Sequence, residues 1–147
     1  MKVSYDFVPE WTIANEKGHI RLTKDWYFTI DGRKIWIPEG YVCDGASIPR
    51  AFWSIVGSPF DPVNAIGAWA HDYLYLTHLT DKKTADEVAF QLWRKSGKGL
   101  WASRTMWFAV SKFGGSAWKN NDEDEKSLVE LRTMIDIRPD KEKFDKV

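Results

Sequence analysis

The apolar positions follow two different periods along the chain, one before about residue 45 and one after it. Between Ile20 and Val42, β-branched and aromatic residues form short runs separated by turn residues, which is typical of β-strands. The segment "DWYFTIDGRKIWIPEG" places two such runs on either side of Asp31-Gly32. That dipeptide tolerates positive φ and favours a tight hairpin turn. This part is therefore predicted to form an antiparallel hairpin or small sheet.

After residue 48 the apolar positions recur at helical spacing. Capping side chains, prolines and glycines delimit four segments, expected at about 49–56, 62–79, 84–96 and 100–113. The fourth segment is apolar nearly all round, so it is predicted to lie at the centre of the helices.

Together these patterns predict an α+β fold, in which an N-terminal antiparallel β-hairpin or small sheet is followed by a bundle of three to four helices. Residues 1–120 are expected to form a single domain, with its β part at about 1–45 and its helical part at about 48–118. Residues 121–147, which include most of "NNDEDEKSLVELRTMI", are expected to form an acidic amphipathic C-terminal helix and tail.

Composition narrows the function classes. Lys and Arg total 21, as do Asp and Glu, so nothing in the net charge of zero favours nucleic acid as a partner. A single cysteine, Cys43, excludes an intrachain disulfide and a cysteine-rich zinc site. Nine Trp is a high number; most are expected in the core, which leaves a minority for a surface that meets a membrane or another protein.

The N-terminus, "MKVSYDFVPEW", has no apolar run of signal-peptide length, and no apolar window approaches transmembrane length. The chain is therefore expected to be made in a cytoplasm, and to stay there or join a larger particle.

Candidate chemistry concentrates in "AHDYLYLTHLTDKKTADEVAF", residues 70–90. On a helix Tyr75 lies one turn after His71 on the same face, whereas Asp72 is turned away by roughly 100°. A short connection brings Asp86, near the start of the next helix, opposite the middle of the first. This hairpin permits a His71–Asp86 hydrogen bond, joined by Tyr75, that fixes the imidazole tautomer and leaves the other ring nitrogen as a general base.

A structural interpretation of the same residues stays open. In that case Asp86 caps its helix or pairs with Lys82, Lys83 or His78, and His71 is a buried structural histidine. Exposure separates the two interpretations, because a catalytic histidine needs a path to solvent and a structural one is sealed under aromatic side chains.

The letters "HDYLY" resemble the His-Asp-x-x-Tyr helix motif of phospholipase A2 enzymes. "PVNAIGAWAHDYLY" with "TADEVAF" is similar in particular to the phospholipase domain of parvovirus minor capsid proteins. The resemblance implies that His71 is the general base, that Asp86 orients it with support from Tyr75, and that Asp72 binds Ca²⁺.

That family has a glycine-rich calcium loop before the His helix, and this chain has no close copy of it. The nearest segments are "CDGAS" and "VGSP", and a carboxylate from Asp44 is the candidate substitute ligand. Within "CDGAS", Gly45, Ala46 and Ser47 suit a tight turn whose N–H groups bind an anion or oxyanion. The same letters equally suit a simple turn with capping side chains.

A second resemblance covers about residues 20–118. The order "IPEGYVCDGASIPR", a short helix, "AHDYLY", "ADEVAF" and an aromatic helix ending in "FGG" is similar to an uncharacterised domain family of tailed phages and prophages, often encoded near tail and lysis genes. It implies a phage origin and places Asp44, Gly45, Ser47 and Pro49 in one site with His71 and Asp72.

Two hypotheses follow. The first is a phage-encoded hydrolase of phospholipase type that acts on host envelope lipid, with Ca²⁺ as the candidate cofactor. The second is a non-catalytic virion or tail accessory protein that binds other phage structural proteins and whose His/Asp cluster is a buried polar network. The segment "FQLWRKSGKGLWASRTMWF", which mixes cations with Trp, suits either anionic lipid headgroups or a helix pair with a solvated edge.

Overall fold

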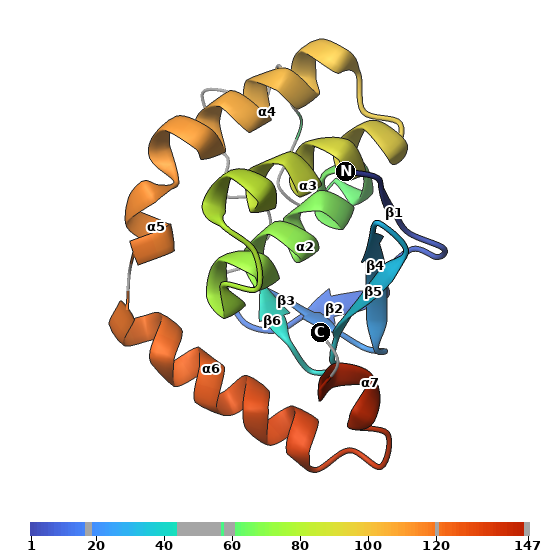
Figure 1. Ribbon diagram of the computed structural model, residues 1–147, viewed down its shortest axis with the longest axis vertical. Coiled ribbons are helices and arrows are strands. Elements are labelled where there is room, and N and C mark those ends of the chain that lie inside the picture. Colours follow the sequence, from blue (N-terminus) through green and yellow to red (C-terminus); the bar gives the residue numbers. More distant parts are fainter. Residues whose placement is uncertain (17–18, 44–56, 58–60, 120, 146–147) are drawn as a thin grey trace. The chain divides into compact units, whose positions relative to one another are not determined.

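The computed structural model describes residues 1–16, 19–43, 57, 61–119 and 121–145 (Figure 1). The predicted helix at 49–56 and the candidate turn at 44–47 lie outside these residues. The contacts divide the chain into two compact units, which we call the strand unit (1–43 with 120–147) and the helical unit (44–119). The prediction of a single domain over residues 1–120 stays a prediction.

Among its described residues, the strand unit contains two three-stranded antiparallel sheets and two helices. One sheet has the order β1-β4-β5 and the other β2-β3-β6. The strands are β1 (Val3–Ser4), β2 (Trp11–Ile13), β3 (Ile20–Leu22), β4 (Trp26–Ile30), β5 (Arg33–Ile37) and β6 (Val42–Cys43). The helices are α6 (Asn121–Asp136) and α7 (Glu142–Asp145).

The predicted hairpin is β4 and β5. Asp31 has φ 50° and Gly32 φ 79°, so both turn residues adopt the positive φ that a two-residue hairpin of this twist requires. The register pairs Trp26 with Ile37 and Ile30 with Arg33.

The C-terminal segment packs within the strand unit. Phe144 of α7 is 4% exposed and lies edge-on to Trp36 of β5, with ring centroids 6.2 Å apart. Asp25 forms ion pairs with Arg138 and with Lys143, the latter at 3.1 Å. This acidic side chain and an aromatic contact together hold the end of the chain to the sheet.

The helical unit contains α2 (Pro62–Thr77), α3 (Lys82–Lys95), α4 (Leu100–Phe113) and α5 (Gly115–Lys119). Asp61 caps α2 by accepting from the Val63 N–H at 3.0 Å, and Asp81 caps α3 by accepting from the Thr84 N–H at 2.7 Å. Antiparallel strands followed by helices confirm the predicted α+β fold. Because Asp81 caps α3, Asp86 is available for other contacts.

A glycine lets α2 and α3 approach closely, one turn before His71. Trp93 of α3 is 2% exposed and lies against Gly67, where an added Cβ would come within 2.6 Å of the indole Cδ1. The indole cannot move away easily, since its N–H donates to the Asn64 carbonyl at 3.0 Å. This contact fixes the spacing of the two helices that carry the candidate site.

The expectation that α4 is central is wrong. Its buried residues are Ser103 and Met106, whereas Trp101 is 75% and Phe108 52% exposed. Met106 joins the apolar cluster that α2 and α3 form around Trp93. The other side of α4 carries apolar residues that remain exposed.

Gly67→Ala should destabilise the protein by roughly 1–3 kcal/mol, because the new methyl group overlaps a buried and hydrogen-bonded indole. Intrinsic helix propensity alone would make the same change favourable by about 1 kcal/mol. Urea unfolding followed by fluorescence measures the effect. Gly115→Ala is the matched control, because an added Cβ there meets nothing within 4 Å. A stabilised Gly67→Ala variant would contradict the close approach.

Candidate functional site

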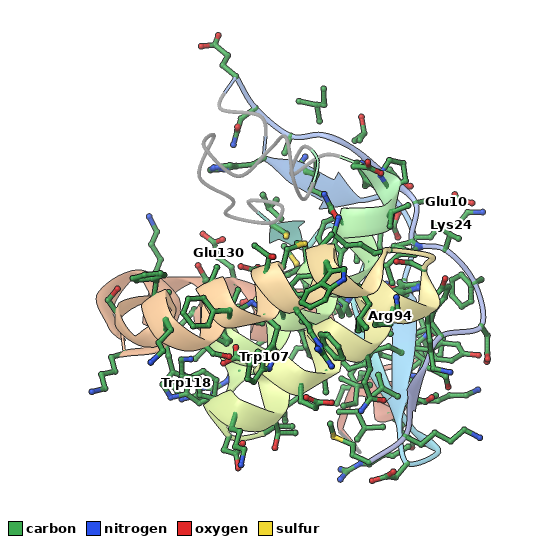
Figure 2. All side chains as sticks on the ribbon, turned by 90° about the horizontal axis from the view of Figure 1, so that it is seen from above. Glu10, Lys24, Arg94, Trp107, Trp118 and Glu130 are labelled. Atoms are coloured by element: carbon green, nitrogen blue, oxygen red, sulfur yellow. The ribbon has the colours of Figure 1, made fainter. Side chains whose placement is uncertain are left out.

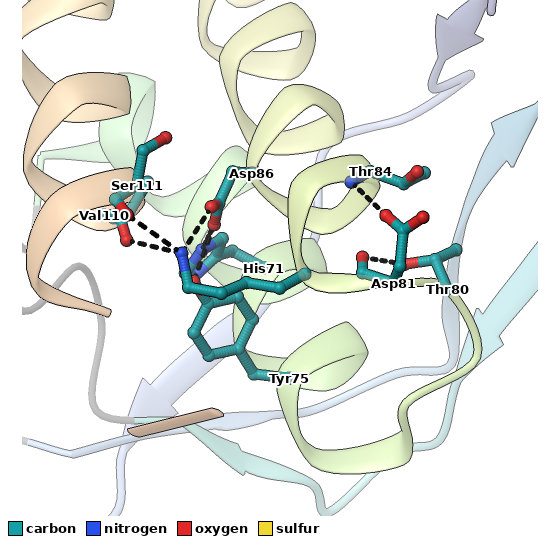
Figure 3. A network of polar contacts seen from close by, with 9 residues as sticks. His71, Tyr75, Thr80, Asp81, Thr84, Asp86, Val110 and Ser111 are labelled. Carbon is teal, nitrogen blue, oxygen red and sulfur yellow. Dashed lines mark hydrogen bonds and ion pairs between the residues drawn. The ribbon is translucent and has the colours of Figure 1, made fainter. Parts of the chain in front are cut away.

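The carboxylate of Asp86 accepts hydrogen bonds from three side chains of the helical unit (Figure 3). Its Oδ1 accepts from Nε2 of His71 at 2.8 Å and from the Tyr75 hydroxyl at 2.7 Å. Its Oδ2 accepts from Nζ of Lys82 at 2.8 Å. Asp86 itself is 2% exposed. The predicted hydrogen bonds among His71, Tyr75 and Asp86 are therefore present, while their catalytic roles stay predictions.

Two pairs of side chains, each at four-residue spacing on one helix, form this arrangement. His71 and Tyr75 are four residues apart on α2, and their rings pack at a tilt of 38° with centroids 4.0 Å apart. Lys82 and Asp86 are four residues apart on α3. The short connection between the helices folds the two pairs against each other, so local spacing and one tight turn suffice to assemble the site.

Electrostatics fixes the protonation of this network. Burial acts to raise the pKa of Asp86, but the hydrogen bonds from His71, Lys82 and Tyr75 outweigh it and hold that pKa below its ordinary value. Burial, the hydrogen bond to Asp86 and its negative charge all raise the pKa of Tyr75, so the phenol stays protonated and donates. An ionised carboxylate can only accept, so Nε2 of His71 must carry a proton, and in the neutral imidazole the lone pair is then on Nδ1.

The side chain of His71 is partly buried, with 16% of its surface exposed to solvent. The contacts that the described residues make with it engage Nε2 and one face of the ring. Within the described part of the chain, Nδ1 has no hydrogen-bond partner, which leaves it available to a water molecule.

Lys82 ties the site to a third helix. Beyond Asp86, its Nζ donates to the carbonyls of Val110 at 3.1 Å and Ser111 at 3.2 Å, in the last turn of α4. The Val110 carbonyl also accepts from the Gly114 N–H at 2.9 Å, and a cation near the C-terminal end of a helix suits the helix dipole. Sequence reasoning considered Lys82 only as an alternative partner of Asp86. Its four-residue spacing from Asp86 was the available signal, whereas its contacts with α4 depend on tertiary structure.

α5 covers the other side of Tyr75. The ring of Trp118 meets Tyr75 edge-on with centroids 5.1 Å apart, and it stacks on His78 at 3.9 Å. Nε2 of His78 lies 3.1 Å from the Trp118 carbonyl, which accepts its hydrogen bond. These contacts restrict the motion of the phenol that donates to Asp86.

The described residues alone do not fit a calcium ion. Asp72 is half-buried and points to a neighbouring side of α2, while Asp44 and the turn residues Gly45, Ala46 and Ser47 lie outside the described residues. In the described part of the chain, no three His, Cys, Asp or Glu side chains gather as metal ligands. Ca²⁺ takes about six to eight oxygens, and Asp72 supplies one carboxylate. Calcium binding stays a prediction.

Fold and site together define an α+β protein with a His–Asp pair on a helical hairpin. The chain belongs to the family described as "Protein of unknown function (DUF1353)", whose model matches residues 20–110. The predicted membership of an uncharacterised domain family is thereby confirmed. The match includes all four side chains of the network: His71, Tyr75, Lys82 and Asp86.

One relative is "Uncharacterized protein y4jT" of Sinorhizobium fredii (strain NBRC 101917 / NGR234). It is 30% identical over 102 residues, which are 69% of this chain and 30% of that protein. The match thus spans less than a third of the relative's length. No solved structure matches the chain. Among the described residues, no helix combines the length and apolar character needed to cross a bilayer.

Asp86→Asn should change how stability depends on pH. The folded pKa of Asp86 lies below the unfolded one, so its contribution is complete above the unfolded value of about 3.9 and is lost as pH falls from there toward the folded pKa. At neutral pH the variant should lose roughly 2–3 kcal/mol, because three donors lose a charged acceptor. The difference from the unmodified protein should shrink in acid.

Urea unfolding at a series of pH values from about 7 to about 2 measures that difference. Asp136→Asn is the control, since its carboxylate is 66% exposed and its ion pair with Lys141 contributes little. A difference that stays constant across the series would show that Asp86 is not held ionised by its partners.

Proposed function

We propose that this protein is a hydrolase in which His71 is the general base that activates water for attack on an ester carbonyl. The observation that carries the proposal is the 2.8 Å bond from Nε2 of His71 to the buried carboxylate of Asp86. That bond orients the imidazole with its basic nitrogen, Nδ1, directed away from Asp86. General-base catalysis needs both the orientation and the lone pair.

The proton transfers of this mechanism use groups of this chain. As the water oxygen attacks, one water proton passes to Nδ1 and the ring becomes a cation, which the negative charge of Asp86 stabilises. The same proton then passes from Nδ1 to the alkoxide that leaves as the ester bond breaks. Nε2 keeps its proton throughout, because Lys82 and Tyr75 hold the carboxylate in its ionised form.

We extend the proposal to a lipid ester as the substrate class, because "HDYLY" resembles the phospholipase A2 motif. Since the chain also resembles a domain family of tailed phages and prophages, we propose host envelope lipid as the target. In this setting the protein is produced in the host cytoplasm and acts as a virion- or tail-associated accessory protein during entry or lysis.

His71→Gln tests the proposal. The Gln amide can still donate to Asp86 from the position of Nε2 but offers no base, so hydrolysis should fall by about 10²- to 10⁴-fold with little change in stability. Mass spectrometry of fatty acid released from phosphatidylglycerol vesicles and from a short-chain soluble phospholipid measures turnover, with added Ca²⁺ and with a chelator. Unfolding in urea checks stability.

His19→Gln is the matched control. His19 belongs to the strand unit, where its Nδ1 lies 3.0 Å from the side-chain nitrogen of Asn15, and the change makes the same substitution outside the unit that contains Asp86. Its turnover should equal that of the unmodified protein. Undiminished turnover in His71→Gln, or no release of fatty acid by the unmodified protein under either condition, would end the hydrolase proposal.

The second candidate is a structural role, in which the network holds α2, α3 and α4 together for assembly into a virion or tail. The contacts of Lys82 with both Asp86 and the α4 carbonyls favour it. Under this alternative, His71→Gln keeps the bond to Asp86 and assembles normally, His71→Ala does not, and no preparation hydrolyses lipid.

Lys82→Met should lower the free energy of unfolding by roughly 1–3 kcal/mol under either candidate, because the Asp86 carboxylate and the two α4 carbonyls each lose one donor. Lys83→Met on the exposed side of α3 is the control and should change it by less than about 0.5 kcal/mol. Urea midpoints of the two variants provide the comparison. Equal midpoints would show that Lys82 does not join α3 to α4.

A further inference from the structure

One face of α4 carries large aromatic side chains into solvent. We call it the aromatic face; its residues are Leu100, Trp101, Arg104, Trp107, Phe108 and Lys112, all exposed. Spacings of three and four residues place them on one side of the helix. Figure 2 labels Trp107 on α4 and Arg94 on the neighbouring helix α3.

These side chains are only partly covered inside the helical unit. The opposite side of α4 supplies Met106, which is 4% exposed, to the cluster around Trp93. On the aromatic face Trp101 is 75%, Phe108 52% and Trp107 38% exposed. Several exposed aromatic residues on one helix face are characteristic of a surface that binds a partner.

The stretch of sequence that contains α4 carries charge of one sign. Between residues 88 and 119 the sequence contains no Asp or Glu. The same stretch carries six cations: Arg94, Lys95, Lys98, Arg104, Lys112 and Lys119. The rest of the chain offsets them with an excess of acidic residues, so the net charge of zero conceals a strongly cationic segment.

Cations and rings are interleaved on the face itself. The guanidinium of Arg104 lies 5.8 Å from the centre of the Trp101 ring, and Nζ of Lys112 lies 5.9 Å from the centre of the Phe108 ring. Each cation thus lies beside an exposed aromatic ring, and cations next to aromatic rings suit the boundary between acyl chains and headgroups.

We propose that the aromatic face binds the surface of an anionic phospholipid bilayer. Trp101, Trp107 and Phe108 enter the headgroup region, while Arg104 and Lys112 pair with lipid phosphates. This inference deepens the proposed function, on which its biological meaning rests, by naming the surface that brings the His71 site to lipid. Lys82 holds the last turn of α4 at the Asp86 carboxylate, so face and site belong to one packed unit.

Charge complementarity favours lipid over a second copy of this chain. Two aromatic faces packed together would bring Arg104 and Lys112 against like charges, with no carboxylate on α4 to neutralise them. A bilayer rich in phosphatidylglycerol supplies negative charge across the whole contact. The binding is therefore expected to weaken as salt is added.

Flotation of the full chain with vesicles tests the inference, using equal parts phosphatidylglycerol and phosphatidylcholine against phosphatidylcholine alone. We expect binding to the anionic vesicles and weaker binding to the neutral ones. Trp101→Ser with Phe108→Ser, and separately Arg104→Glu with Lys112→Glu, should each lower the partition coefficient about tenfold or more. Circular dichroism and urea midpoints confirm that the variants fold.

Two control variants match these changes elsewhere. Ile137→Ser removes an apolar side chain that is 78% exposed, and Lys126→Glu reverses an exposed charge; both should bind as the unmodified protein does. Absence of binding to anionic vesicles, or equal loss in the controls and the α4 variants, would overturn the inference. So would sedimentation showing that the aromatic face mediates self-association.

The vesicle-binding and turnover assays test the surface and the proposed function independently. His71→Gln should bind vesicles like the unmodified protein, because it leaves α4 intact. Vesicle binding without any hydrolysis would refute the proposed hydrolase function and support the lipid-binding surface. Hydrolysis of the short-chain soluble phospholipid without vesicle binding would refute the lipid-binding surface and support the proposed hydrolase function.

Discussion

A carboxylate buried among helices must be compensated, and the helical unit is organised around that requirement. Asp86 is almost fully removed from water, yet it is held ionised by a histidine and a tyrosine from α2 and a lysine from its own helix. An uncompensated charge in that position would cost several kcal/mol, of the order of a domain's whole stability. The helices therefore have to meet where their donors reach the same carboxylate.

The same contacts serve both candidate roles, which is why the sequence alone left them open. In the catalytic role, Asp86 must be ionised so that it fixes the proton on Nε2 of His71. In the structural role, the same carboxylate must be ionised so that it binds Lys82. The two contacts use different oxygens of one carboxylate and so do not compete. What separates the roles is the chemistry at Nδ1, a nitrogen that contributes nothing to the packing described here.

Features set by short stretches of sequence could be predicted, and features set by packing could not. Asp31-Gly32 encodes its own hairpin, and Asp61, Asp81 and the glycines mark the helix ends, because turn and cap preferences act over a few residues. The contact of His71 with Asp86 followed from helical spacing and a short connection. The exposure of α4 did not follow, because an apolar helix surface does not reveal how many neighbours will cover it. The contacts of Lys82 with α4 were missed for the same reason.

The close approach at Gly67 has a consequence for how such a protein tolerates change. The distance between α2 and α3 depends on a missing methyl group one turn from the histidine, so the spacing of the helices and the His71–Asp86 contact are coupled there. If the protein has the proposed hydrolase activity, a saturation library screened for its loss would recover position 67 beside position 71, although a glycine has no functional group. A ranking of positions by their sensitivity to substitution would therefore not distinguish residues that set the helix spacing from residues that react. A parallel screen for folded protein would separate the two groups.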